Sequence, residues 1–129
     1  MNVQGVVIRT SPYSVKKTID NLQSLLEQKG ATIYARINQQ AEANKAGHNL
    51  KPLEFLLFGN PKAGGEIMEE NPLSALDLPL KVIAWQDDQN NTQVAFNSGP
   101  YIMERYTLSE KNTTVLNLEP LIDLALKQD

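Results

Sequence analysis

The sequence has no cysteine and only one histidine, His48. Without cysteine the chain has no disulfide framework, no thiol nucleophile and no thiolate metal ligand. A zinc site would then need mostly carboxylate ligands, which is unusual. Ser74 and Ser109 have no histidine partner other than His48, so the sequence contains no readable Ser-His-Asp triad. We therefore predict no metal, no cofactor and no assigned catalytic residue.

The sequence also lacks long apolar runs and runs of basic residues. The apolar runs are only a few residues long, far short of the roughly 20 residues of a transmembrane helix. A net charge of −3, without a basic run, argues against nucleic acid or an anionic membrane as a partner. The first residues lack the basic and apolar regions of a signal peptide, which predicts a cytoplasmic protein. The alternative is an exported protein whose signal peptide has been removed, because the absence of cysteine is equally compatible with that compartment.

One strongly apolar stretch stands out, Phe-Leu-Leu-Phe at residues 55–58. Four consecutive large apolar residues predict a strand buried on both faces. Gly-Asn-Pro-Lys-Ala-Gly-Gly follows at residues 59–65 and predicts a tight loop. Its glycines would allow backbone N–H groups to point into one cavity, and Lys62 would add positive charge, which favours an anion site. The loop lacks the Gly-Lys-Ser/Thr ending of a phosphate loop, and the same residues also suit a plain turn.

Strands and helices alternate along the rest of the chain. Apolar residues at helical spacing follow Ser14, a good N-cap, and end before Gly30. In residues 32–37 the alternation predicts a half-buried strand with Ile33, Ala35 and Ile37 on one face. The predicted strands are residues 3–10, 32–37, 53–58, 80–85 and 92–97; the predicted helices are residues 15–29, 40–46, 66–70, 100–106 and 118–125, the last capped by Asn117.

A polar turn at residues 87–91 makes the two strands that flank it a hairpin. Because hairpin strands are antiparallel, we predict an α+β fold in one domain, residues 1–129, with a mainly antiparallel twisted sheet and the long helices packed on one face. A doubly wound parallel sheet is the alternative. In the connector before the hairpin, Leu73, Leu76 and Leu78 are expected to turn inward.

Three segments resemble the DUF302 family: residues 52–64, 76–82 and 97–105, within a match over roughly residues 30–108. The resemblance implies a small fold like that of the TATA-binding-protein class, a curved antiparallel sheet backed by helices, and it implies no activity. Family members often carry Asp-His where this chain has Asn38-Gln39, and His where it has Tyr106. A chemistry based on those imidazoles is therefore not expected here.

Three further polar residues extend the candidate ligand site. Lys81 lies mid-strand on the face of Ile83 and Trp85, so it either reaches the surface or lines a pocket with a paired anion. Asn97 and Arg105 flank the turn at residues 98–100, and Arg105 either binds an anion or braces a carboxylate. The predicted ligand-binding residues are Gly59, Asn60, Pro61, Lys62, Gly64, Lys81, Asn97 and Arg105.

These residues favour a small-molecule or anion-binding module. One alternative is a homodimeric structural or interaction protein, because the first strand is a candidate edge strand. Another is a hydrolase- or isomerase-type enzyme that uses a lysine, Tyr34 or a carboxylate as base. The sequence argues against the enzyme, since the usual nucleophiles and imidazoles are absent or isolated.

Overall fold

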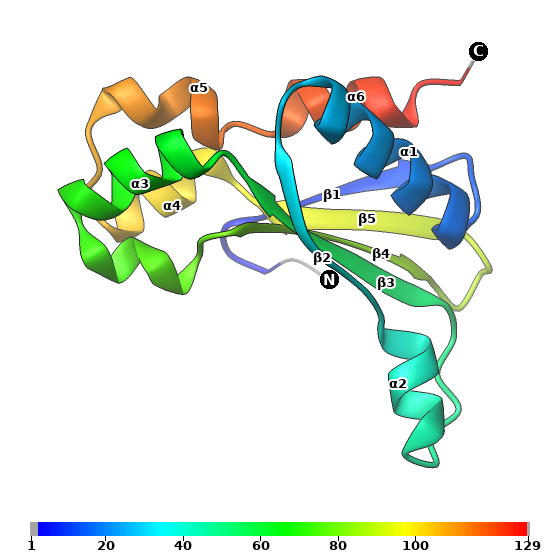
Figure 1. Cartoon of the computed structure of the whole chain (residues 1–129). Helices are drawn as coiled ribbons and strands as arrows, with labels where there is room; N and C mark the ends of the chain where they lie inside the picture. Colours follow the sequence, from blue (N-terminus) through cyan, green and yellow to red (C-terminus); the bar gives the residue numbers. More distant parts are fainter. Residues whose placement is uncertain (1–2, 129) are drawn as a thin grey trace.

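The computed structural model describes residues 3–128 and contains a five-stranded sheet (Figure 1). Its strand order is β1-β5-β4-β3-β2, and every neighbouring pair is antiparallel. The predicted α+β fold is confirmed, and the parallel alternative is wrong. The first strand is an edge strand, as expected. The strands are β1 Val6–Ser11, β2 Thr32–Asn38, β3 Leu53–Gly59, β4 Leu80–Gln86 and β5 Thr92–Asn97.

The helices occupy three places around this sheet (Figure 1). Helices α1 and α6 lie on one face, α3, α4 and α5 gather beyond one end, and α2 projects at the other end. The α-helices are α1 Val15–Gln28, α2 Gln39–Lys45, α3 Pro61–Glu70, α4 Gly99–Arg105, α5 Thr113–Leu116 and α6 Glu119–Leu126; the 3₁₀ helices are η1 Pro72–Leu76 and η2 Glu110–Asn112.

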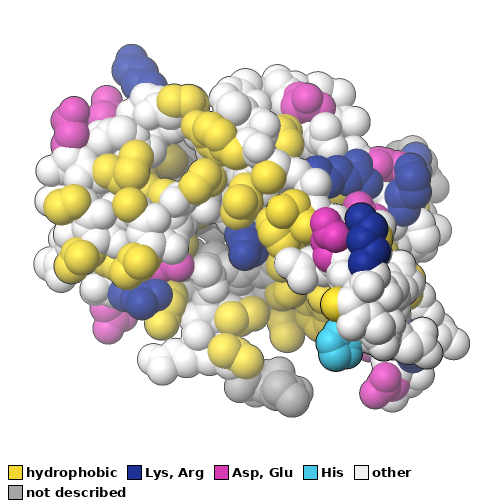
Figure 2. All heavy atoms as spheres, turned by 60° about the horizontal axis from the view of Figure 1, so that its bottom comes forward, with side chains coloured by type: hydrophobic (Ala, Val, Ile, Leu, Met, Phe, Trp, Pro, Cys, Tyr) yellow, Lys and Arg dark blue, Asp and Glu magenta, His cyan; other side chains and the backbone are white. Residues whose placement is uncertain are grey.

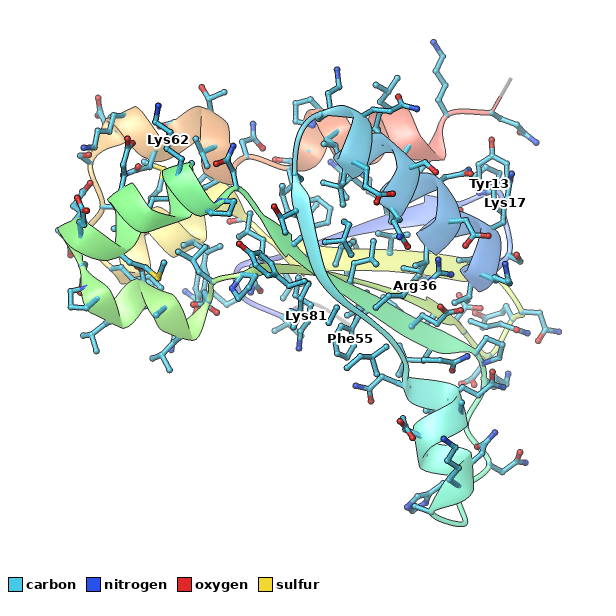
Figure 3. All side chains as sticks on the ribbon, in the orientation of Figure 1. Tyr13, Lys17, Arg36, Phe55, Lys62 and Lys81 are labelled. Carbon is cyan, nitrogen blue, oxygen red and sulfur yellow. The ribbon has the colours of Figure 1, made fainter. Side chains whose placement is uncertain are left out.

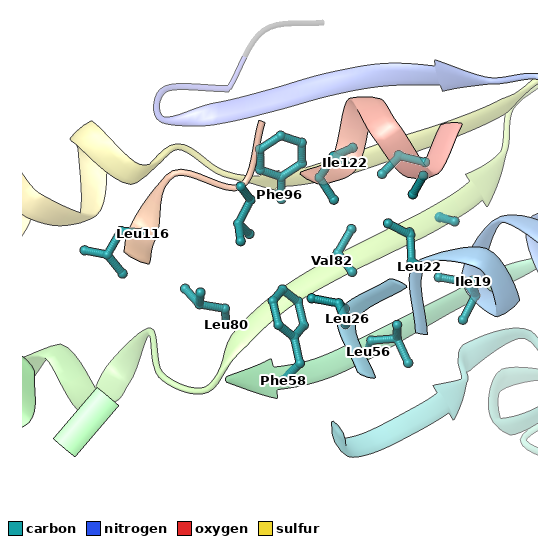
Figure 4. Close-up of a cluster of buried hydrophobic side chains, with 14 of the residues drawn as sticks. Ile19, Leu22, Leu26, Leu56, Phe58, Leu80, Val82, Phe96, Leu116 and Ile122 are labelled. Carbon is teal, nitrogen blue, oxygen red and sulfur yellow. The ribbon is translucent and has the colours of Figure 1, made fainter. Parts of the chain in front are cut away.

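The core lies between the sheet and helices α1 and α6 (Figure 4). The Ser14 side chain caps α1 by accepting a hydrogen bond from Lys17 N, as predicted. The apolar stripe of α1 packs against alternate residues of β3 and β4. Each large aliphatic side chain buried in this way stabilises the fold by roughly 1.5–3 kcal/mol. The fully buried members include Ile19, Leu22, Leu56, Val82 and Ile122.

A bulge in β2 reverses the face predicted for its second half. The register shifts between Ile33 and Ala35, so Ile33 pairs with Phe58 on the helix-covered face, whereas Ala35 pairs with Leu57 on the opposite face. Ile37 is consequently exposed. The predicted shared face for Ile33, Ala35 and Ile37 was wrong, because one extra residue in a strand inverts the alternation that follows it.

The connector before β4 also differs from the prediction. Leu73 and Leu76 do not turn inward; they are 64% and 74% exposed. The segment forms η1, in which side chains three residues apart lie on the same side of the helix. Ser74 is the residue that faces inward, and its hydroxyl donates to Asn71 O.

The end of the chain shows a smaller difference. Helix α6 begins at Glu119, two residues after Asn117, the expected cap. The Asn117 side chain still accepts a hydrogen bond from Glu119 N at 3.3 Å. Leu118 takes the N-cap position without a side-chain hydrogen bond. The predicted apolar stripe of this helix is retained, because Ile122 and Ala125 are buried.

Candidate functional site

Residues 59–65 are not the open loop that their composition predicts. Helix α3 begins at Pro61, five residues earlier than expected. Asn60 is its N-cap, and Asn60 Oδ1 accepts hydrogen bonds from Lys62 N at 3.0 Å and Ala63 N at 3.3 Å. Gly64 N donates to Asn60 O at 2.7 Å. These amide groups are therefore satisfied within the first turn of the helix, which is the usual effect of an Asn cap followed by Pro.

The two lysines of the predicted site point in different directions. Figure 3 shows Lys62 on the outer side of α3, whereas Lys81 extends from the sheet face opposite α1, beside Phe55. Lys62 is exposed. Lys81, which is also exposed, lines one of the two cavities around residues 59–81, and Lys62 lines neither. The structure thus separates Lys62 from Lys81, because α3 turns the Lys62 side chain away from the sheet.

A cavity of about 310 Å³ lies beside Lys81, and we call it the Lys81 cavity. Asp77, Lys81 and Asn97 give it a polar side, while Leu57 and Leu80 belong to its apolar walls. Lys81 is placed there by β4: the alternation that buries Leu80 turns the next side chain to the opposite face of the sheet. Lys81 and Asn97 of the predicted site therefore line one cavity.

Arg105 contributes to this cavity indirectly. Its guanidinium pairs with Asp77 Oδ2 at 3.0 Å, and the Tyr106 hydroxyl donates to the same oxygen. Burial, followed by the hydrogen bond to Asp77, raises the pKa of Tyr106 above its usual range. Asp77 is thus held by two partners from the end of α4. Of the two roles considered for Arg105, the structure gives it that of a brace for a carboxylate.

The Lys81 ammonium lies 4.5 Å from the centroid of the Phe55 ring. Within residues 3–128, no carboxylate pairs with it at 4.0 Å or less. Asp77 lines the same cavity, but its charge is balanced by Arg105. The Asn97 carboxamide likewise makes no side-chain hydrogen bond to the described residues. The cavity therefore presents a cation and a carboxamide that are free to bind another molecule.

A second cavity, of about 280 Å³, lies between the ends of β2 and β3 and helices α3 and α5, and we call it the apolar cavity. Gly59, Asn60 and Gly64 of the predicted site line it. The larger lining side chains are those of Tyr34, Ile67, Met68, Val115 and Leu116. The glycine-containing segment thus contributes apolar surface and space rather than amide groups.

The predicted site residues fall into three groups. Lys81 and Asn97 line the Lys81 cavity, Gly59, Asn60 and Gly64 line the apolar cavity, and Pro61, Lys62 and Arg105 line neither. Asp77 was not among the predicted site residues. Its spacing from Arg105 and Tyr106 gives no local signal, because the three residues meet only through the tertiary fold.

Comparison with known proteins agrees with this architecture. The family model described as "Domain of unknown function DUF302" matches residues 7–125. The chain belongs to the DUF302 family. A crystal structure of an uncharacterised conserved DUF302 protein from Bacillus stearothermophilus is similar to this DUF302 domain, with a TM-score of 0.78 and 17% sequence identity over 96% of this chain and 97% of that one. At this identity the likeness shows the fold.

Curated relatives of this DUF302 domain are longer proteins. Proteins named fluoride-specific ion channel FluC 1, from Brucella suis and Brucella abortus, are each 31% identical to it over 104 residues. The match covers 81% of this chain but 41% and 38% of those proteins. The chain therefore spans about two fifths of the length of the curated relatives it matches. Within residues 3–128, no helix has the length and apolar character needed to cross a bilayer.

Two of the positions at which this chain departs from the family pattern, Asn38 in place of Asp and Tyr106 in place of His, have structural roles here. Asn38 caps α2, since its side chain accepts a hydrogen bond from Ala41 N at 2.9 Å. Tyr106 is buried and holds Asp77. No group of three His, Cys, Asp or Glu residues that could hold a metal ion occurs in residues 3–128. Of the predicted site residues, Lys81 and Asn97 are the polar ones that line the Lys81 cavity.

Proposed function

We propose that this DUF302 domain binds a small organic anion in the Lys81 cavity. The observation that carries the proposal is the Lys81 ammonium, which lies at a cavity with apolar walls while the carboxylate beside it is paired with Arg105. A few polar groups that converge on a cavity with apolar walls are typical of small-molecule sites. Lys81 would pair with the anion, and the Asn97 carboxamide would donate a second hydrogen bond.

Two features support the choice of an anion. Asp77, Arg105 and Lys81 leave one positive charge unbalanced at the cavity. The Phe55 ring beneath the ammonium restricts its position without neutralising it. Hydrogen bonds to charged groups contribute about 1.5–3 kcal/mol, which corresponds to a change in affinity of roughly 10- to 150-fold. Pro61 and Lys62 have no part in this proposal.

Acetate, benzoate, phosphate and fluoride are suitable probes, each titrated into the labelled protein and followed by NMR chemical shifts. Fluoride is included because the curated relatives are named as fluoride-specific channels. We expect benzoate to bind more tightly than fluoride, since a bare halide cannot use the apolar walls. Shifts should be largest at Lys81 and Asn97.

Lys81→Met removes the charge and keeps a side chain of similar length, and Lys62→Met is the matched control on α3. We expect Lys81→Met to weaken benzoate binding at least tenfold and Lys62→Met to leave it unchanged. Equal binding by both variants, or no binding of any probe by the original chain, would contradict the proposal.

The homodimer is a second candidate, supported by the open face of the sheet. Helices α1 and α6 cover only one face (Figure 1), and hydrophobic side chains gather across the opposite face (Figure 2). Ile8 of β1 and Ile37 of β2 are exposed there. An enzyme with a lysine base has less support, because the described residues give Lys81 no carboxylate partner.

A further inference from the structure

We propose that the ligand of the Lys81 cavity is an amphiphilic carboxylate, whose apolar tail of several carbons occupies the apolar cavity. This inference rests on the proposed function, because it assigns the head group to Lys81. It adds the class of ligand: a straight-chain or arylalkyl carboxylic acid rather than an inorganic anion or a short acid.

The two cavities share part of their lining. Leu78, Pro79 and Leu80 line both, so one three-residue segment forms a shared boundary between them. At about 310 and 280 Å³, each is near the lower end of the usual range for small-molecule sites, roughly 300–1,000 Å³, and together they lie within it. A molecule that crosses the shared segment would use both.

The chemical character of the lining changes across the segment formed by residues 78–80. On one side are Asp77, Lys81 and Asn97; on the other, the side chains are almost all apolar. Asn60 and the Tyr34 hydroxyl are the exceptions, and the Asn60 carboxamide oxygen is occupied as the cap of α3. Burying a charged or strongly polar group in the apolar cavity would leave it without a partner, which is costly. An apolar chain has no such cost.

Exposed apolar side chains surround the apolar cavity. Tyr34, Met68 and Val115 line it and are 49%, 38% and 43% exposed. They come from β2, α3 and α5, so segments distant in sequence bring apolar surface to one place. Contiguous exposed apolar surface of this kind is typical of ligand-binding grooves. A bound tail would cover side chains that otherwise contact water.

Gly64 leaves space at this cavity. Apart from its chain neighbours and the backbone of its own helix, a Cβ placed on Gly64 would meet no atom within 4 Å, and the same is true of its neighbour Gly65. Gly64 lines the apolar cavity, whereas Gly65 does not. The two glycines lie in the same helix, which gives a matched pair of positions for testing whether that space receives a ligand.

The first experiment compares acetate, butyrate, hexanoate and octanoate, each kept well below its aggregation threshold, by calorimetry. Burial of a methylene contributes about 0.8 kcal/mol, which is roughly a fourfold gain in affinity per carbon. We expect the dissociation constant to fall by about this factor for each carbon until the apolar cavity is filled. Octanol, which has the tail without the charge, should bind far more weakly than octanoate, and Lys81→Met should reduce octanoate binding to a similar level.

Gly64→Leu places a side chain in the apolar cavity, and Gly65→Leu is its control. We expect Gly64→Leu to bind acetate and butyrate as the original chain does but to lose the gain from butyrate to octanoate. Gly65→Leu should retain that gain. If Gly64→Leu does not fold, methyl NMR of Met68 gives a second measurement: its signal should shift with octanoate and not with acetate.

The outcomes separate this inference from the proposed function. Lys81-dependent binding of benzoate or acetate without any gain from chain length would overturn the amphiphilic ligand and leave the anion site standing. A chain-length gain that persists in Gly64→Leu, or an unmoved Met68 signal with octanoate bound, would also overturn it. Failure of every acid to bind in a Lys81-dependent manner would overturn both.

Discussion

Arg36 shows how much a single side chain depends on the bulge in β2. The bulge turns Arg36 toward the helix-covered face, where its Nε donates to Glu54 at 3.1 Å and its Nη1 to Asp20 at 2.7 Å. Glu54 is 9% exposed, so its carboxylate depends on this partner. The two ion pairs of Arg36 join β2 to α1 and to β3. They stabilise the orientation that the bulge gives to the Arg36 side chain.

Arg36→Met should therefore destabilise the protein. The substitution leaves the Glu54 carboxylate buried without its guanidinium, and we expect a loss of about 1–3 kcal/mol in the free energy of unfolding. Urea denaturation measures the change. Lys16→Met is the control: Lys16 pairs with Asp20 at 3.0 Å on the exposed side of α1, and such pairs contribute about 0.2–1 kcal/mol. Equal losses in the two variants would contradict the assignment.

Gly99 begins α4 at a place where a side chain does not fit. A Cβ there would lie 2.7 Å from Leu116 O and 2.8 Å from Leu116 C, which are backbone atoms of α5. We expect Gly99→Ala to reduce the free energy of unfolding by about 1–3 kcal/mol, because α4 and α5 would have to move apart. Thermal denaturation checks this, and an unchanged midpoint would show that the two helices separate without cost.

At the scale of the helix, α3 gives the opposite expectation. Gly64 and Gly65 lie within it, and a Cβ at either position meets nothing beyond its own helix within 4 Å. Alanine is more favourable than glycine inside a helix by roughly 0.5–1 kcal/mol. We expect Gly65→Ala to raise the free energy of unfolding by about this amount, measured by urea denaturation. A loss of stability would mean that α3 needs the glycine conformation, contrary to its helical geometry.

Elements whose local pattern matched their tertiary environment were predicted well. The helix after Ser14 and the hairpin of β4 and β5 both follow from periodicity and capping, because each buries one face against the core. Buried Val82 and Val94 lie on the predicted faces. For these elements, side-chain spacing and burial favour the same structure, so the sequence alone was sufficient.

The candidate site was harder to predict because its geometry depends on features that the local sequence pattern does not reveal. Glycine and proline at residues 59–65 suggested a loop, yet Asn60 and Pro61 together start a helix. The β2 bulge leaves no mark in the alternation of residues 32–37. Lys81 and Asn97 were identified, but Asp77 and its partner Tyr106 meet through contacts 29 residues apart in sequence. Such contacts are set by the whole fold.

At the scale of the whole molecule, the open sheet face makes the association state testable. If two copies pair through this face, Ile8→Lys and Ile37→Lys should each shift a dimer toward monomer, because burying an unpaired lysine is costly. Light scattering at several protein concentrations measures the shift. Leu124→Lys is the control, since Leu124 is exposed on α6, which lies on the covered side of the sheet. A monomer at high concentration would rule out the homodimer.

The response of the whole fold to acid follows from carboxylates that connect distant elements. The backbone N–H of Ser109, followed by the Asn112 carboxamide, lowers the pKa of Glu70, and this contact joins α3 to the segment before α5. Hydrogen bonds from Arg36 and then Lys16 lower the pKa of Asp20. A folded-state pKa below the unfolded value means that the unfolded chain binds protons more readily as the pH falls.

These carboxylates should therefore stabilise the fold fully above the unfolded-state pKa, about 4, and progressively less as the pH falls through the lower folded-state values. We expect the free energy of unfolding to change little between pH 7 and pH 5.5 and to decrease below about pH 4.5. Urea denaturation across this range measures the decrease. Glu70→Gln keeps the shape of the side chain but cannot titrate, so it should be less stable at pH 7 and lose less on acidification. An equally steep acid dependence in that variant would show that Glu70 is not one of the groups responsible.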